Sequence, residues 1–144
     1  MERLEILRNW ICQFPLWGDM PVHIDTLPVQ PENAGLYPLG MEVLERKADL
    51  LGNVTERCRQ KFDLYRSAVP GEDPAKWTLE FARWVQKQGA LGLTPRFGDV
   101  PTAEQIRAEK GRLKEITAAG TAVYAVTITA DFIKIMEENE HGEN

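Results

Sequence analysis

The segment from Thr121 to Met136 constrains the fold more than any other stretch of the chain. It reads T-A-V-Y-A-V-T-I-T-A-D-F-I-K-I-M, contains neither Pro nor Gly, and is rich in β-branched and aromatic residues. One parity holds Tyr124, Val126, Ile128, Ala130 and Phe132, and the other holds Val123, Ala125, Thr127, Thr129 and Asp131. Because successive side chains leave a strand on opposite faces, this period of two predicts a long, half-buried β-strand. Gly120 precedes it and suits a hairpin turn, so we expect this strand to pair with a strand over Lys110–Thr117.

A second β-hairpin is predicted between Leu39 and Ala68, with its turn at Gly52-Asn53. Its second arm runs from Val54 to Ala68. Val54, Cys58, Phe62 and Leu64 share one parity of that arm, and Arg57, Arg59, Lys61 and Tyr65 share the other. The first arm, about Gly40 to Leu50, also contains helix formers at spacings of three and four, so a helix remains an alternative there.

Two helices flank these strands in the sequence. Residues 2–14 place Leu4, Leu7 and Ile11 on one side, and Pro15 ends the helix. Asp73-Pro74 opens the clearest helix, because Asp73 can cap the first free N–H groups and Pro suits the first helical position. We expect it to end at Gly89 and to lie across a sheet with an aromatic face. That face is formed by Trp77, Phe81, Trp84, Val85 and Gln88.

The remaining segments are shorter or irregular. Val22–Leu27 alternates and reads as an edge strand, whereas 28–38 and 91–101 are Pro/Gly-containing loops and Thr102–Arg107 is ambiguous between strand and helical turn. Together the segments predict an α+β fold, with a single mostly antiparallel β-sheet packed against two or more α-helices. We expect one domain over residues 1–136 and a disordered acidic tail over residues 137–144.

Composition narrows the function classes. The chain has 144 residues and a net charge of −5, which disfavours a general nucleic-acid coat. Cys12 and Cys58 are too few for a disulfide framework, so we expect both to be reduced and buried. The N-terminus has no signal-peptide pattern, and no apolar run is long enough for a transmembrane helix, so an intracellular protein is expected.

No constellation of residues predicts catalysis, a cofactor or a metal site. His23 and His141 are the only histidines, and Ser67 is the only serine and lacks a G-x-S-x-G context. Cys58 lies between Arg57 and Arg59, but strand alternation places the thiol and the two cations on opposite faces. We therefore expect no enzyme, no cofactor and no metal ion.

Basic residues repeat on two of the predicted strands. Arg57, Arg59 and Lys61 share one face, and Lys110, Arg112 and Lys114 repeat the pattern further along. Three interpretations stay open: a surface for nucleic acid or an acidic partner, a solvated strand face that discourages edge aggregation, or a contact with acidic residues of a neighbouring copy.

Several short motifs, in order along the chain, resemble one family. They are F-P-L-W at 14–17, A-G-L-Y-P-L-G at 34–40, L-G-N-V at 51–54, L-G-L-T-P-R-F-G-D at 91–99, A-E-K-G-R-L-K-E at 108–115 and G-T-A-V-Y-A-V-T-I-T-A-D-F at 120–132. The chain resembles small proteins encoded among the head–tail morphogenesis genes of phages and prophages of Gram-positive bacteria. These are described as minor capsid or tail terminator proteins.

The resemblance implies a structural role in the virion. A tail terminator forms a homo-oligomeric ring, typically a hexamer, which caps the tail tube and joins it to the head–tail connector. The implied partners are therefore the chain itself, a tail tube protein and a connector protein, with no membrane and no specific nucleic acid. The implied location is the host cytoplasm during assembly and then the tail or neck of the virion.

The candidate contact residues are Arg57, Arg59, Lys61, Lys110, Arg112 and Lys114 on strands, and Tyr37, Arg96 and Phe97 in loops. The alternatives are another phage neck or minor capsid component, or a small intracellular ligand-binding or accessory domain.

Overall fold

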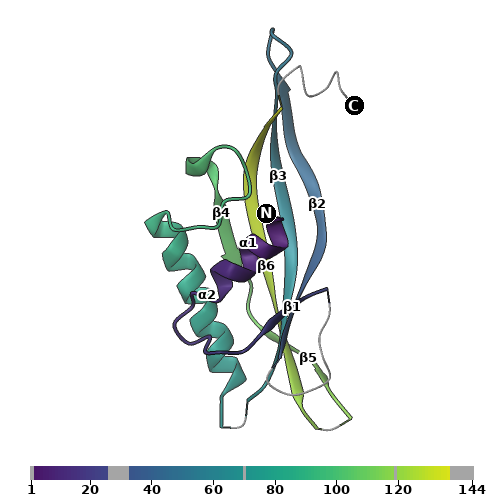
Figure 1. Ribbon diagram of the computed structural model, residues 1–144, viewed down its shortest axis with the longest axis vertical. Helices are drawn as coiled ribbons and strands as arrows, with labels where there is room; N and C mark the ends of the chain where they lie inside the picture. The colour runs from purple at the N-terminus through teal and green to yellow at the C-terminus, as the bar shows by residue number, and fades with distance from the viewer. Residues whose placement is uncertain (1, 26–32, 70, 119, 137–144) are drawn as a thin grey trace.

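The computed structural model describes residues 2–25, 33–69, 71–118 and 120–136. Its helical elements are α1 (Arg3–Ile11), α2 (Pro74–Leu91) and the 3₁₀ turn η1 (Pro101–Ala103). Its strands are β1 (Val22–Ile24), β2 (Ala34–Ala48), β3 (Val54–Ser67), β4 (Gln105–Ala108), β5 (Arg112–Ile116) and β6 (Ala122–Met136). The strands form one sheet in the order β1-β2-β3-β6-β4, and β5 pairs with the same outer edge of β6 as β4 does (Figure 1).

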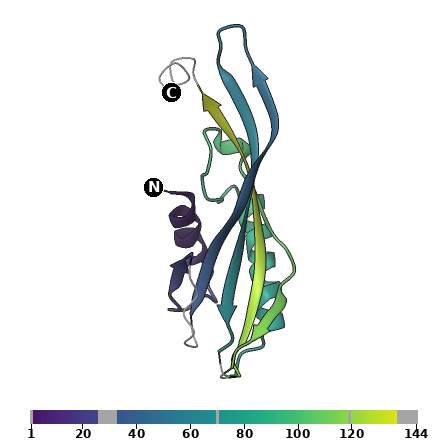
Figure 2. The ribbon, with the colours of Figure 1, turned by 90° about the vertical axis from the view of Figure 1, so that its right-hand side faces the viewer.

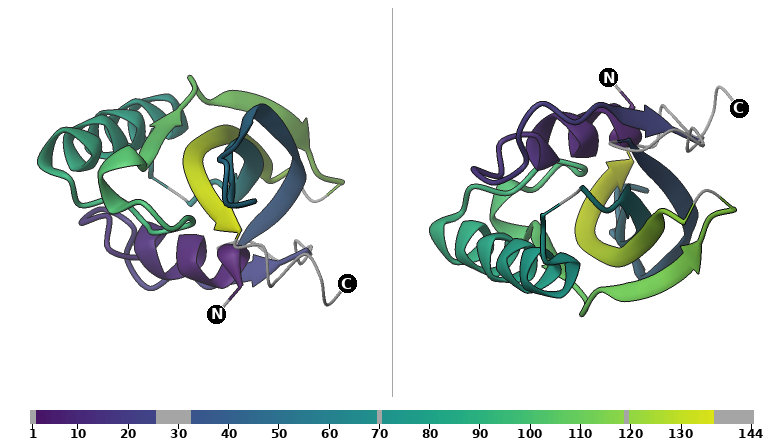
Figure 3. Two further views of the ribbon diagram at one scale, coloured as in Figure 1. Left: turned by 90° about the horizontal axis from the view of Figure 1, so that it is seen from above. Right: turned by 90° about the horizontal axis from the view of Figure 1, so that it is seen from below.

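Antiparallel pairing dominates this sheet, and the predicted α+β fold is confirmed. Among the strands that the structure describes, β1 alone runs parallel to its neighbour, β2. β3 and β6 pair without a register shift, from Ser67 opposite Val123 to Val54 opposite Met136. The sheet is long and strongly twisted (Figure 2). Seen along the long axis, β6 curls through a wide arc (Figure 3).

The hydrophobic core lies between one face of the sheet and the two helices. We call this the helix face. The strands contribute Leu36, Cys58, Phe62, Leu64, Val126, Ile128 and Phe132 to it. The helices meet in an aromatic cluster, in which the Trp10 and Trp84 rings lie 4.6 Å apart and the Phe14 and Phe81 rings 5.4 Å apart. Burying each large side chain contributes about 1.5–3 kcal/mol, so this cluster holds both helices on the sheet.

The two predicted hairpins are confirmed, and the first arm of the longer one is a strand rather than a helix. The loop expected over 28–38 is wrong for Ala34–Pro38, which pair with β3, while residues 28–32 lie outside the described part of the chain. The ladder accommodates Pro38 by a register shift between Pro38 and Gly40, and Gly40 takes a positive φ of 116°. A proline without an N–H is tolerated in a strand at such an irregularity.

Other boundaries moved by a few residues. The ambiguous segment resolves into η1 followed by β4, and the strand expected over Lys110–Thr117 is Arg112–Ile116. Cys58 is buried as expected, but Cys12 is exposed, because it follows the last residue of α1 on the side away from the core. The expected acidic tail, residues 137–144, lies outside the described residues.

The end of α2 also differs from the prediction. Asp73 caps the start as expected, accepting hydrogen bonds from the N–H groups of Ala75 and Lys76 at 3.1 and 3.3 Å. The helix continues through Gly89 and ends at Gly92, whose φ of 71° is left-handed. Leu93 then donates to the carbonyl of Gln88 at 2.9 Å, which satisfies one of the last free carbonyls of the helix.

This assignment predicts opposite effects for two nearby glycine substitutions. Gly89→Ala should raise the free energy of unfolding by about 1 kcal/mol, because alanine favours a helix interior and its Cβ meets only ordinary contact distances. Gly92→Ala should lower it by about 1–2 kcal/mol, because the left-handed conformation is strained for alanine. Chemical denaturation of the two variants beside the wild type measures both, and a loss of stability in Gly89→Ala would contradict the assigned helix end.

Candidate interaction surfaces

The sheet face away from the helices collects most of the predicted contact residues. We call it the open face, defined by Tyr37 of β2, the odd-numbered residues 57–65 of β3, the odd-numbered residues 123–133 of β6, and Arg107, Arg112 and Lys114. The pairing register places Arg57, Arg59 and Lys61 beside Ile133, Asp131 and Thr129. Arg112 reaches the same face further down, where it bonds to Thr127. The basic residues of β3 and β5 therefore lie on the same face of the sheet, which the parity within each strand did not by itself predict.

Ion pairs neutralise much of this face. Arg59 donates two hydrogen bonds to the Asp131 carboxylate, at 2.8 and 3.0 Å. Arg107 lies 3.9 Å from the same carboxylate. The bidentate contact with Arg59 holds the pKa of Asp131 below its usual range. The Arg59 guanidinium is thus already paired with a carboxylate of its own chain.

A second polar cluster lies lower on the open face around the buried carboxylate of Asp63. Thr127 donates its hydroxyl to Asp63 at 2.7 Å, and Tyr65 donates to it at 3.1 Å. Arg112 lies 3.4 Å from the same carboxylate. Burial, followed by the nearby Asp63 charge, raises the pKa of the Tyr65 hydroxyl. The polar groups around Asp63 therefore satisfy one another, whereas the buried hydroxyl of Thr129 further along the same face has no hydrogen-bond partner among the described residues.

Two basic side chains of the open face remain unengaged. Within the described ranges, no carboxylate lies within ion-pair distance of Arg57 or Lys61, and both residues are exposed. Lys114 instead pairs with Glu115 at 3.4 Å and lies over the Tyr65 ring at 4.5 Å. The free positive charge of this face is therefore confined to its upper half.

The loop residues predicted to make contacts behave differently from one another. Tyr37 is part of β2 and packs against Tyr65, with ring centroids 5.1 Å apart. Phe97 is buried in the core against Phe62 and Phe132, so its prediction as a contact residue is wrong for this structure. Arg96 is exposed in the same loop, and Lys110 is exposed in the connection between β4 and β5.

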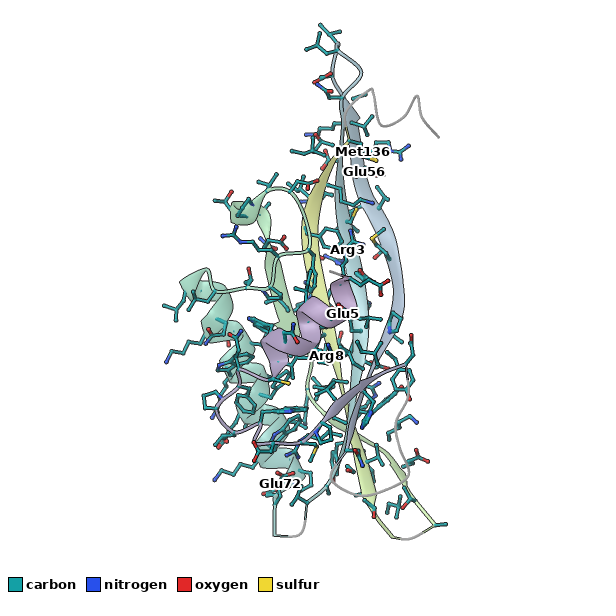
Figure 4. The ribbon with its side chains drawn as sticks, in the orientation of Figure 1. Arg3, Glu5, Arg8, Glu56, Glu72 and Met136 are labelled. Carbon is teal, nitrogen blue, oxygen red and sulfur yellow. The ribbon has the colours of Figure 1, made fainter. Side chains whose placement is uncertain are left out.

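Sequence reasoning missed two exposed apolar features. The first is the tip of the β2–β3 hairpin, residues 49–53, which projects beyond Met136 at the end of β6 (Figure 4). Leu50 is fully exposed and Leu51 is 74% exposed. The Asp49 carboxylate accepts hydrogen bonds from the N–H groups of Leu51 and Asn53, at 2.8 and 2.9 Å, and these bonds lower its pKa. The tip therefore presents two leucines on a fixed turn, and their adjacency beside Gly52-Asn53 was the available signal.

The second feature is a groove between α2 and β4, with a volume of about 680 Å³. We call it the α2–β4 groove. It is lined by Leu79, Ala82, Arg83, Gln86 and Gly89 of α2 and by Glu104 to Ala108. Leu79 is half exposed, and Arg83 is an exposed cation at the rim of the groove. The Glu104 carboxylate is occupied by the N–H groups of Phe97 and Gly98, at 2.8 and 2.7 Å. No sequence pattern pointed to this groove, because it depends on α2 lying beside an edge strand distant in sequence.

Metal binding and membrane insertion find no support in the described residues. There, no group of three or more His, Cys, Asp or Glu side chains could hold a metal ion. His23 instead contacts Asn33, with 3.0 Å between its Nε2 and the amide oxygen. The two helices that the structure describes are too short or too polar to cross a membrane.

No protein-family model and no curated protein sequence matches this chain.

The ion pairing predicts different outcomes for two charge reversals on neighbouring positions. Arg57→Glu should change the free energy of unfolding by no more than about 0.5 kcal/mol, because no described ion pair is lost. Arg59→Glu should clearly lower it, because a second carboxylate would then face Asp131. Thermal unfolding of both variants measures the difference, and equal stability of the two would contradict the assigned pairing.

The depressed pKa of Asp131 predicts a pH dependence. Its contribution to stability is fully present above the unfolded-state pKa, near 3.9, and is lost as pH falls through the lower folded-state value. Asp131→Asn should therefore be less stable than the wild type at pH 7, and the gap should narrow below about pH 4. Urea denaturation between pH 7 and pH 2.5 tests this. Arg59→Gln, which removes the other partner of the ion pair, is the control. A stability difference between Asp131→Asn and the wild type that does not change with pH would contradict an electrostatic role for Asp131.

Proposed function

We propose that this chain is a structural, self-assembling phage protein, a tail terminator that forms a ring on the tail tube and joins it to the head. One observation carries the proposal. The sheet projects a hairpin tip with two exposed leucines, while a separate groove, lined by both apolar and polar residues, opens beside α2. Exposed apolar patches on a folded subunit are typical of protein–protein contact sites. The motifs that resemble head–tail morphogenesis proteins agree with this assignment.

The proposal assigns no chemical reaction and no cofactor to the chain. The partners are other copies of the chain, the tail tube protein and the head–tail connector. The free cations Arg57 and Lys61, together with Lys110 and Arg96, are candidates for contacts with those two proteins. Another neck or minor capsid component would use the same surfaces.

A second candidate is a small ligand-binding or accessory domain. The volume of the α2–β4 groove favours it, because small-molecule sites commonly occupy about 300–1,000 Å³. The two candidates differ in what the groove receives: a small molecule in one case and a protein segment in the other.

The absolute mass of the purified chain tests the proposal. Light scattering over a concentration series should show a species of about six subunits, and class averages of that species should show a closed ring with a central hole. If the chain stays monomeric at all concentrations, both alone and with tail tube protein added, the ring proposal is wrong. The accessory-domain candidate then takes its place.

A further inference from the structure

The hairpin tip and the α2–β4 groove are complementary in character. The tip offers two exposed leucines beside the exposed carboxylate of Asp49. The groove offers the apolar side chains of Leu79, Ala82 and Ile106 beside the side chain of Arg83. Arg107 also lines the groove, but its guanidinium lies 3.9 Å from Asp131 on the open face, and the Glu104 carboxylate accepts the N–H groups of Phe97 and Gly98. Within the described residues, no carboxylate lies within ion-pair distance of Arg83, so this cation can face a carboxylate such as Asp49.

The tip cannot reach the groove of its own chain. Gln105 of β4 lies opposite Asp131, which lies opposite Arg59 of β3. Leu51 is eight residues further along the hairpin from Arg59, which corresponds to roughly 26 Å of extended strand. The tip also points away from α2, along the long axis of the molecule (Figure 1). Any occupant of the groove that resembles the tip must therefore come from a different molecule.

The conformation of the tip is also fixed by hydrogen bonds within the turn. Asp49 fixes the turn through its bonds to Leu51 and Asn53, and the Asp49 N–H donates to the Asn53 carbonyl at 2.9 Å. A turn that is already fixed loses little conformational freedom when it docks, so more of the contact energy remains as affinity. A flexible loop with the same two leucines would lack this advantage.

We infer that the hairpin tip of one copy docks into the α2–β4 groove of the next copy, with Leu50 and Leu51 against Leu79 and Ile106 and with Asp49 facing Arg83. This inference rests on the proposed ring and specifies its subunit contact. The two patches are different surfaces of the chain, so the contact is head-to-tail. Repetition of a head-to-tail contact gives a ring when the rotation closes.

Complementation between two damaged subunits tests this contact. Leu50→Asp/Leu51→Asp removes the tip and keeps the groove, whereas Leu79→Asp damages the groove and keeps the tip. The dissociation constant for assembly should rise at least about tenfold in each variant, as expected for residues at the centre of an interface. Each variant alone should therefore remain monomeric at concentrations where the wild type assembles. Mixed in equal amounts, they should form a heterodimer and nothing larger, because only one productive contact remains.

Leu113→Asp is the matched control, since Leu113 and Leu79 are equally exposed and Leu113 belongs to neither patch. It should assemble like the wild type. Circular dichroism of every variant serves as the control for folding. A disulfide provides a second readout in a Cys12→Ser background, which removes the exposed native thiol. Leu51→Cys protein mixed with Leu79→Cys protein should give a cross-linked heterodimer.

The outcomes separate this inference from the proposed function. If the wild type assembles and the tip variant assembles equally well, or no cross-link forms, the contact is wrong while the ring remains. If the wild type never assembles, both are wrong. If the mixture gives the heterodimer and the cross-link, the contact is established.

Discussion

The antiparallel pairing of β3 with β6 is the constraint on which the rest of the structure depends. It runs without a register shift over the whole length of both strands, and it fixes which side chains face the helices. Phe62 and Ile128 are thereby placed under the aromatic cluster of α1 and α2, while Asp63 and Thr127 are turned to the open face. A slip of one residue would exchange the two sets, burying charges against tryptophans. The same strands extend the β2–β3 hairpin beyond the helices. The packing of the core and the position of the hairpin tip therefore both depend on this pairing.

Most cations of the open face are engaged by carboxylates of the same chain. Arg59, Arg107 and Arg112 are drawn to Asp131 and Asp63, which lie on neighbouring strands. Each pair removes positive charge that a phosphate backbone would need. What stays free is a small cationic area around Arg57 and Lys61. That area suits a limited contact with an acidic protein surface, whereas the proposed contact between copies uses the apolar tip and the mixed lining of the α2–β4 groove.

Much of the fold was predictable from the sequence, and the failures have physical reasons. Alternation in Thr121–Met136 and Val54–Ala68 predicted two strands and their inward faces, because burial on one side imposes a period of two. The start of α2 followed from Asp73-Pro74, whereas its end was misplaced, because the aromatic packing of the helix outweighs the low propensity of Gly89. Phe97 was expected to make contacts because it lies in a Gly/Pro-rich loop, but its side chain is buried in the core. The basic residues were found, but their ion pairs depend on partners that are distant in the sequence, such as Asp131 for Arg59, which is 72 residues away. The α2–β4 groove could not be predicted from the sequence for the same reason, because it forms between two segments that are distant in the sequence.

The central claim is that contacts between copies use the hairpin tip and the α2–β4 groove. Hydrogen–deuterium exchange of the unmodified protein, compared between dilute and concentrated samples, tests this most directly. The account predicts that backbone amides of residues 49–53, of α2 and of β4 exchange more slowly in the concentrated sample, while amides of β5 and of residues 57–65 of β3 do not change. Slower exchange confined to β5 and residues 57–65, with no change at the tip, α2 or β4, would contradict it.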